Sequence, residues 1–281
     1  MKIGYLGPQG SYSHEASLQY AAEMGGATQS IGLPSFSAII EGVEGGGLDY
    51  GIIPVENSTH GAVASVMDLL VNLRQSAVCG ELVLAIEHCL LGRSTGLDTI
   101  RYVYSHEQAL EQCRGFFHQY PHMELMNCAS TTQACEMARE HGSLYGAVAS
   151  RAAARLYDLS LLAENIQDNA FNQTRFLVIA LLKTKPTGRD KTSIVFAFHD
   201  DRPGSLFSVL KSFAESHINL SRIESRPAKH IMGKYIFYID FCGHAEDNTS
   251  RAILKEISAQ VSWLKVLGSY PASRGREENG R

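Results

Sequence analysis

The feature that most constrains the fold is an alternation of apolar, strand-like runs with amphipathic, helix-like segments between residues 1 and 182. Residues 36–43, for example, place apolar side chains at helical spacing, and the short apolar run 49–53 follows them. Strands that are separated by helices can pair in parallel, because the helix carries the chain back across the sheet. The alternation therefore predicts an α/β fold, with parallel sheets that are covered by helices on both faces.

A second pattern begins after the polar residues 183–190, which Pro186 and Gly188 interrupt. Strand-like and helix-like segments then follow in the order βαββαβ, at residues 192–199, 205–217, 220–225, 234–242, 248–261 and 263–269. This order, in a unit of small-domain size, predicts a ferredoxin-like fold.

Charge and hydropathy narrow the function. The chain has 25 Lys and Arg against 29 Asp and Glu, and no basic cluster stands out, so nucleic acid is not an expected partner. The N-terminus lacks the apolar core of a signal peptide, and no apolar run approaches the length of a membrane span. We therefore expect a cytoplasmic protein with no membrane partner, whose anionic ligands are held by local groups.

A polar segment at residues 168–176 precedes the apolar run 177–182. It includes the amide of Asn172, the hydroxyl of Thr174 and the guanidinium of Arg175, at the mouth of a predicted buried strand. Such groups suit an anionic small molecule that carries a hydroxyl. In a regular strand Thr174 and Arg175 point in opposite directions, and we expect Thr174 to face the ligand.

Other polar groups follow predicted strands or begin predicted helices. Glu56, Asn57 and Ser58 follow the strand at 49–53, at the carboxyl end where open α/β sheets bind ligands. Ser11 lies in a glycine-rich turn before a helix, where free backbone N–H groups favour anions.

Two further helix starts contribute candidates. Ser105 is a predicted N-cap, and Gln112 lies seven residues further along, two turns down one face of the same predicted helix. Residues 130–133, which include Thr131, fit a capping box.

Taken together, these motifs resemble the prephenate dehydratase family with its C-terminal ACT regulatory domain. The resemblance covers residues 1 to about 270 and depends on segments that occur in the family's order, at residues 7–13, 54–58, 105–113, 130–131, 172–176 and 224–227. It implies a two-lobed catalytic domain similar to a type II periplasmic binding protein at 1–183, in which the chain crosses between lobes near 76–80 and 158–165. The ferredoxin-like ACT domain would occupy 191–271, followed by a disordered tail at 272–281.

The resemblance also implies roles for the candidate residues. It assigns catalysis to Thr174 and implicates Asn57, Ser105 and Gln112. Around them we expect a substrate-binding set made of Arg175, Ser11, Glu56, Ser58, Thr131, Asn172 and Phe176. In the ACT domain the family's E-S-R-P motif corresponds to Glu224, Ser225, Arg226 and Pro227. The family's G-A-L-V motif is altered to Gly204, Ser205, Leu206 and Phe207, which leaves the affinity for the effector open.

The implied reaction converts prephenate to phenylpyruvate, CO2 and water in phenylalanine biosynthesis, with feedback inhibition by L-phenylalanine. It requires no cofactor or metal, and the sequence has neither a nicotinamide fingerprint nor a metal-spaced His/Cys cluster. An alcohol is a weak acid, so we expect Thr174 to give a directed hydrogen bond to the leaving hydroxyl. Glu56, His60 and His106 remain competing sources of the proton.

Alternatives stay open at this stage. Arogenate dehydratase acts on a substrate that differs only by an amine, and a non-catalytic amino-acid sensor could combine the same domains. From the resemblance we expect a homodimer or homotetramer that is assembled through ACT domains.

Overall fold

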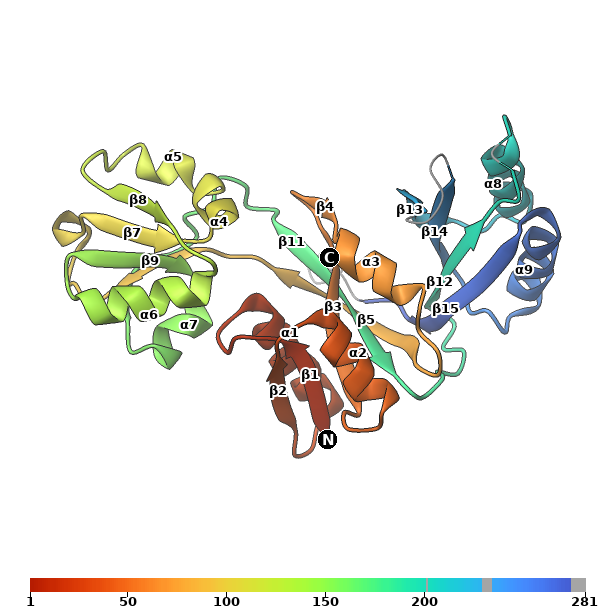
Figure 1. Cartoon of the computed structure of the whole chain (residues 1–281), viewed down its shortest axis with the longest axis horizontal. Helices are drawn as coiled ribbons and strands as arrows, with labels where there is room; N and C mark the ends of the chain where they lie inside the picture. Colours follow the sequence, from red (N-terminus) through yellow and green to blue (C-terminus); the bar gives the residue numbers. More distant parts are fainter. Residues whose placement is uncertain (201, 229–233, 274–281) are drawn as a thin grey trace. The chain divides into compact units, whose positions relative to one another are not determined.

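The computed structural model describes residues 1–200, 202–228 and 234–273. The chain divides into two compact units. Unit 1 comprises Met1–Ala38, Glu56–Gly61 and Leu84–Arg175, and unit 2 comprises Ile39–Val55, Ala62–Val83 and the chain from Phe176 onward. Figure 1 shows the elements of both units.

Unit 1 begins with β1 (Lys2–Leu6), α1 (Tyr12–Met24) and β2 (Gln29–Leu33), and β1 and β2 pair in parallel. The hydroxyl of Ser11 accepts a hydrogen bond from the backbone N–H of His14 at 3.3 Å and so caps α1. A strand, a tight turn and a capped helix start therefore occur here as the sequence predicts.

The rest of unit 1 is built on a five-stranded sheet of order β10-β6-β9-β7-β8. Its strands are β6 (Cys89–Gly92), β7 (Tyr102–Ser105), β8 (Glu124–Asn127), β9 (Tyr145–Ala149) and β10 (Ser160–Ala163). β7 is parallel to β8 and β9, whereas β6 is antiparallel to β9 and β10. The prediction of parallel sheets is thus wrong for β6, which runs antiparallel to both of its neighbours in this sheet.

Short helices surround this sheet: η1 (Leu97–Thr99), α4 (Glu107–Glu111), α5 (Arg114–Phe117), α6 (Thr131–His141) and α7 (Arg151–Leu156). The predicted single helix after residue 105 is wrong, because α4 and α5 are separate. The N-cap of α4 is His106, whose Nδ1 accepts from the backbone N–H of Gln108 at 3.3 Å. Ser105 is the last residue of β7, so it does not share a helix face with Gln112.

The apolar sequence of residues 82–91 also predicts one long strand, and this prediction is wrong. β5 (Ala77–Ala85) ends before β6 begins, and residues 86–88 connect them. In this connection the N–H of Ile86 donates to Asn172 O at 2.9 Å, and the N–H of His88 donates to Gln167 Oε1 at 2.8 Å. The backbone therefore pairs with the polar segment that precedes β11 instead of continuing a strand.

The first elements of unit 2 are α2 (Phe36–Glu44), β3 (Tyr50–Asn57), β4 (Gly61–Ala62), α3 (Ala64–Leu70), β5 and β11 (Gln173–Ala180). The limits between the units pass through α2, β3, β5 and β11. The strand order of the largest sheet is β2-β1-β3-β11-β5, with β4 paired to β3.

The C-terminal part of unit 2 confirms the predicted βαββαβ order. Its elements are β12 (Asp190–Ala197), α8 (Ser205–Glu215), β13 (Leu220–Pro227), β14 (Tyr235–Cys242), α9 (Asn248–Gln260) and β15 (Trp263–Pro271). The sheet order is β13-β14-β12-β15, with antiparallel pairs throughout, and α8 and α9 lie beside each other on one face (Figure 1). Val209 and Phe213 of α8 share a buried cluster with Ile253 and Ile257 of α9.

The predicted disordered tail starts too early. The N–H of Ala272 donates to Arg189 O at 2.8 Å, and that of Ser273 donates to Glu81 Oε1 at 2.9 Å. Residues 274–281, and Asp201 in the turn predicted before α8, lie outside the described residues.

Candidate functional site

Three amides and a hydroxyl come together in unit 1 from separate parts of the chain. Asn57 Nδ2 at the end of β3 lies 2.9 Å from Asn172 Oδ1 and 2.9 Å from Thr174 Oγ1. Asn172 Nδ2 lies 2.6 Å from Gln112 Oε1. We call Asn57, Gln112, Asn172 and Thr174 the amide cluster.

A tight turn after β3 sets the direction of the Asn57 amide. Its Oδ1 accepts from the backbone N–H groups of Thr59 at 2.9 Å and His60 at 3.0 Å. The next side chain, Ser58, donates to Phe171 O at 3.1 Å and accepts from Gln173 N at 2.9 Å. Ser58 therefore connects this turn to the start of β11, and its hydroxyl hydrogen is used by the backbone.

Thr174 has the geometry of a hydrogen-bond donor. Its Oγ1 accepts from the Asn57 amide, which is its side-chain partner among the described residues. Because a hydroxyl has one hydrogen and two lone pairs, this contact leaves the O–H free to donate.

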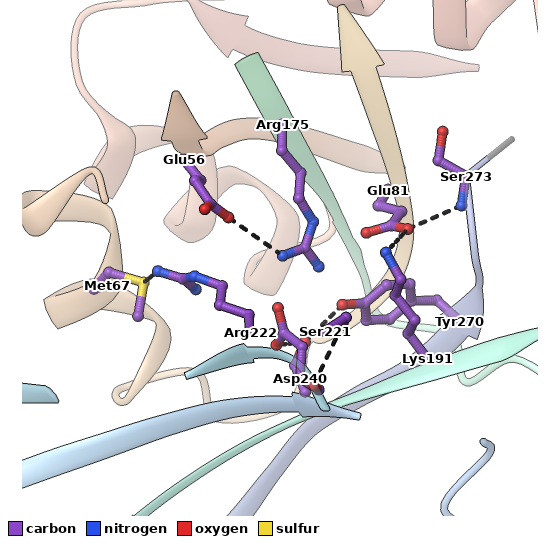
Figure 2. A network of polar contacts seen from close by, with 11 residues as sticks. Glu56, Met67, Glu81, Arg175, Lys191, Ser221, Arg222, Asp240, Tyr270 and Ser273 are labelled. Carbon is purple, nitrogen blue, oxygen red and sulfur yellow. Dashed lines mark hydrogen bonds and ion pairs between the residues drawn. The ribbon is translucent and has the colours of Figure 1, made fainter. Parts of the chain in front are cut away.

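Arg175 is placed differently from Thr174. Its Nη1 lies 3.9 Å from Glu56 Oε2 (Figure 2), and its side chain is 12% exposed. Glu56 precedes Asn57 on β3, just as Arg175 follows Thr174 on β11. Each pair of neighbours makes separate contacts, as expected from the alternation of side chains along a strand.

Two predicted site residues are placed where they do not join the cluster. Ser105 is fully buried, and its hydroxyl donates to Val148 O at 2.7 Å. Phe176 is 2% exposed and belongs to the apolar core, because the strand has passed from its polar start to its buried part. Neither side chain lies among the polar groups of the amide cluster, and their predicted roles in the site stay predictions.

Two other predicted residues mark helix starts. Ser11 caps α1, and its own hydroxyl donates to Leu6 O at 3.3 Å. Thr131 is the first residue of α6, whose cap is Ser130. These positions offer backbone N–H groups of the kind that stabilise an anion.

The sequence prediction missed His88. This residue is 3% exposed, and its Nε2 lies 2.9 Å from Gln112 Oε1. Its Nδ1 lies 2.8 Å from the hydroxyl of Tyr12. Burial lowers the pKa of His88, although the bond to Gln112 opposes this shift. No sequence signal pointed to it, because it stands in a run that reads as one long apolar strand.

The predicted effector motifs lie in the C-terminal part of unit 2. Gly204 adopts φ 89° just before α8, and Ser205 is the first residue of that helix. The side chain of Leu206 packs against the buried cluster that α8 and α9 share with their sheet. On β13, Glu224 and Arg226 are half-buried, whereas Ser225 and Pro227 are exposed.

The same strand contacts α3 within unit 2. Arg226 Nε lies 3.4 Å from Asp68 Oδ1. Figure 2 shows the neighbouring contact, in which Arg222 Nη2 lies 3.3 Å from Met67 Sδ. The Tyr238 hydroxyl of β14 donates to Met67 O at 3.0 Å. One residue of the predicted effector motif is therefore an ion-pair partner of α3.

Two lysines also connect the sheet of β12–β15 to earlier elements of unit 2. Lys265 of β15 donates to Val71 O at 2.8 Å and also to Leu73 O, near the C-terminal end of α3. Burial lowers the pKa of this lysine. Lys191 Nζ of β12 lies 2.7 Å from Glu81 Oε1, and the Glu81 side chain is fully buried (Figure 2).

The backbones of β15 and β5 also approach each other closely. A Cβ atom added at Gly268 of β15 would lie 2.0 Å from Val78 O of β5. Only glycine permits this approach. We call the contacts of β12–β15 with α3 and β5 the seam.

Other kinds of site are not found in the part of the chain that the structure describes. No group of His, Cys, Asp and Glu there has a metal-binding arrangement. No described helix is long and apolar enough to cross a bilayer.

An α/β framework with a cluster of neutral hydrogen-bonding groups, joined to a ferredoxin-like domain, describes a metabolic enzyme with a small-molecule-sensing domain. The sequence model of prephenate dehydratase matches residues 3–184, and that of the ACT domain matches residues 192–259. The chain belongs to the prephenate dehydratase family.

Named relatives support this assignment. The chain is 40% identical to a bifunctional chorismate mutase/prephenate dehydratase of Aquifex aeolicus, over 96% of this chain and 74% of that protein. It is 38% identical to a prephenate dehydratase of Methanocaldococcus jannaschii, over 95% of this chain and 97% of that protein.

Solved structures agree. A prephenate dehydratase of Arthrobacter aurescens in complex with L-Phe has a TM-score of 0.87 and 30% identity, covering 97% of this chain and 90% of that one. A protein described as a novel type of quorum quenching acylase, GqqA, has a TM-score of 0.86 and 30% identity, covering 97% and 98%.

Proposed function

We propose that the chain is a prephenate dehydratase, which converts prephenate to phenylpyruvate, CO2 and water in phenylalanine biosynthesis. The observation that carries the proposal is the Thr174 hydroxyl, which accepts from Asn57 and keeps its own hydrogen for a ligand. A cytoplasmic location fits a biosynthetic enzyme. We propose residues 1–183 as the catalytic domain and 191–271 as the ACT domain.

The reaction needs a polarised leaving group and a correctly held dianion. The bond between the ring and its carboxylate breaks, and its electron pair enters the ring as CO2 departs. The ring C–O bond breaks on the other side, and the hydroxyl takes a proton to leave as water. Thr174 donates a hydrogen bond to that hydroxyl, whereas the neutral amides of Asn57 and Gln112 orient the substrate. Positioning of this kind can lower a barrier by several kcal/mol, about 7 or more in favourable cases.

Among the competing proton sources we favour His60. Its Nδ1 lies 3.2 Å from Asn57 Oδ1 and 3.3 Å from Gln112 Nε2, at the edge of the amide cluster. His106 instead caps α4, and Glu56 pairs with Arg175.

For the substrate carboxylates we propose the backbone N–H groups at the starts of α1 and α6, because helix starts carry partial positive charge. Arg175 points away from Thr174 along β11 and pairs with Glu56, so we propose that it contributes through the position of this strand. Asn172 and Ser58 contribute through the positions of Asn57 and of the turn after β3. Ser105 would act only through the end of β7.

The regulatory proposal is that L-phenylalanine binds the ACT domain and inhibits the enzyme. The relative crystallised with L-Phe supports this choice of effector. The proposed contacts are the Gly204 turn with Ser205 and Leu206, and the β13 residues Glu224, Ser225, Arg226 and Pro227. The effector would then act on α3 through Arg226, the partner of Asp68.

We further propose assembly through the ACT domain, as a homodimer or a pair of such dimers. β13 is at one end of its sheet, and Ile223 on it is 45% exposed. Phe207 on α8 is 68% exposed. An open edge beside exposed apolar side chains favours pairing with a second copy. Sedimentation of Ile223→Lys should show a smaller species than that of the unsubstituted protein.

Likeness to GqqA makes amide hydrolysis a second activity to assay. An activated nucleophile needs an adjacent base, and the side-chain partner of the Thr174 hydroxyl in the described part of the chain is an amide. This geometry favours the dehydratase.

The direct test supplies prephenate, arogenate and an N-acyl amide separately to the purified full chain. We expect phenylpyruvate, detected by its ultraviolet absorbance, from prephenate. Phenylalanine formed faster from arogenate would redirect the proposal to arogenate dehydratase. No turnover of any of the three compounds would leave only an amino-acid sensor.

A further inference from the structure

The amide cluster continues into two buried side chains that the proposed mechanism does not use, His88 and Tyr12. The backbone of His88 is held on both sides, since its N–H donates to Gln167 Oε1 and its carbonyl accepts from the N–H of Ile166 at 3.0 Å. The ring is therefore fixed on the connection between β5 and β6.

The hydrogen positions along the cluster follow from the backbone. The N–H groups of Thr59 and His60 can only donate, so the atom of Asn57 that faces them is its oxygen. The Asn57 nitrogen must then face Asn172, Thr174 and the carbonyl oxygen of Gln173 at 3.2 Å. A backbone carbonyl can only accept, which gives the same orientation independently.

The next amides are oriented in turn. Because the Asn57 nitrogen donates to Asn172, the atom of Asn172 that it meets is Oδ1, and Nδ2 faces Gln112. The atom of Gln112 that receives this bond is therefore its oxygen. Gln112 Nε2 then points toward His60 Nδ1, at 3.3 Å.

This orientation fixes the state of His88. Its Nε2 lies 2.9 Å from Gln112 Oε1, which can only accept, so Nε2 carries a hydrogen. Burial lowers the pKa of the imidazole and favours the neutral form, in which Nδ1 is an acceptor. The Tyr12 hydroxyl, whose pKa burial raises, keeps its hydrogen and shares it between His88 Nδ1 at 2.8 Å and Glu87 O at 2.9 Å.

We infer that His88 is a positioning residue for the dehydratase reaction: its Nε2–H holds the Gln112 oxygen, so that the Gln112 NH2 group is presented as a donor to the substrate. Gln112 Oε1 then receives two hydrogen bonds, one from His88 and one from Asn172. Without His88 only the bond from Asn172 holds this oxygen, so the amide is fixed less firmly and presents its NH2 group to an anionic substrate for a smaller fraction of the time. Tyr12 supports the required tautomer by donating to the opposite ring nitrogen.

The inference rests on the proposed function, and variants of His88 separate positioning from simple filling of the core. The amide nitrogen of a glutamine reaches about as far from Cα as Nε2, whereas that of an asparagine reaches only as far as Nδ1. We expect His88→Asn to lower kcat for prephenate by about 10- to 100-fold, and His88→Gln to restore most of it. KM should change less than kcat, because the substrate carboxylates keep their own partners.

A double-mutant cycle identifies the path of the effect. If His88 acts through Gln112, the variant with His88→Asn and Gln112→Ala together should be no slower than Gln112→Ala alone. Independent, multiplicative losses would overturn the inference, and so would equal activity of the Asn and Gln variants. Circular dichroism confirms that each variant is folded.

If a His88→Asn preparation is unfolded, the cycle is run with Tyr12→Phe. This change removes the donor to Nδ1 and leaves the ring in place, and the same non-additivity with Gln112→Ala is expected. Additive losses would again overturn the inference. A failure of the proposed function can be told apart from a failure of the inference, since the unsubstituted enzyme would then form no phenylpyruvate.

Discussion

The amide cluster of unit 1 is held together by neutral hydrogen-bonding groups, whereas the seam of unit 2 is held together by charged side chains. The cluster consists of neutral groups, and each hydrogen bond in it fixes the direction of the next. The seam relies on charge, with Lys191 on a buried Glu81, Arg226 on Asp68 and Lys265 on helix-end carbonyls. Neutral donors can orient a dianion without neutralising the carboxylate that must leave as CO2. Charged pairs are suited to holding a domain in place.

The largest effect is expected when the amide of Asn57 is replaced by a carboxylate. Asn57→Asp keeps an oxygen for the Thr59 and His60 N–H groups, but it presents a second oxygen to Asn172 and Thr174. We expect kcat for prephenate to fall by about 10²- to 10³-fold with the fold intact, because the donor is lost where the reaction needs it. Asn248→Asp, at an exposed position in unit 2, is the matched control. Activity of Asn57→Asp near that of the control would contradict the role of the cluster.

A second variant removes one positive charge from the seam. Lys191→Met leaves the Glu81 carboxylate buried with the backbone N–H of Ser273 but without its lysine. We expect a loss of about 3 kcal/mol in the free energy of unfolding, because removing one partner of a buried ion pair is costly. Urea denaturation measures it. The combination with Glu81→Gln should recover most of the loss, and a combination no more stable than Lys191→Met would be evidence against the ion pair.

A smaller change tests whether the seam transmits regulation. Asp68→Asn removes the charge that meets Arg226, both side chains being partly exposed, so stability should fall by less than about 1 kcal/mol. Basal turnover should be retained. The concentration of L-phenylalanine for half-inhibition should nevertheless shift severalfold, because the motif residue loses its partner on α3. An inhibition curve that superimposes on that of the unsubstituted enzyme would remove Arg226 from the path.

The smallest expected effect is on pH dependence. Burial lowers the pKa values of His14 and His88, so the unfolded chain binds protons at these residues more readily than the folded one. Stability should therefore fall as pH drops below about 6.5, the usual histidine value. His88→Gln should make this slope shallower between about pH 5 and 6.5, as measured by urea midpoints. A slope unchanged from that of the unsubstituted enzyme would mean that His88 does not titrate in this way.

Sequence periodicity predicted the order of the elements from β12 to β15, because each of them has its own apolar face. Periodicity did not predict the limits or the direction of strands where these depend on residues far away in the sequence. Residues 82–91 read as one strand, yet the backbone N–H groups of Ile86 and His88 donate to oxygen atoms of Asn172 and Gln167. The direction of β6 could not be read from its own residues either.

The site shows the same limit. Local motifs and the family resemblance pointed to Asn57, Asn172 and Thr174, which the fold brings within hydrogen-bond distance of one another. His88 was missed, since its importance comes from a contact 24 positions away in sequence with Gln112. Phe176 was predicted as a site residue but lies in the buried part of β11, because a sequence motif does not tell which strand positions are buried.

The most direct test of the central claim, that the Thr174 hydroxyl donates to the leaving hydroxyl, compares kcat for prephenate in two variants of Thr174. Thr174→Ser keeps the hydroxyl and should retain much of the activity. Thr174→Val keeps the shape without the donor and should lose nearly all of it, about 10³-fold. A fully active valine variant would contradict the account.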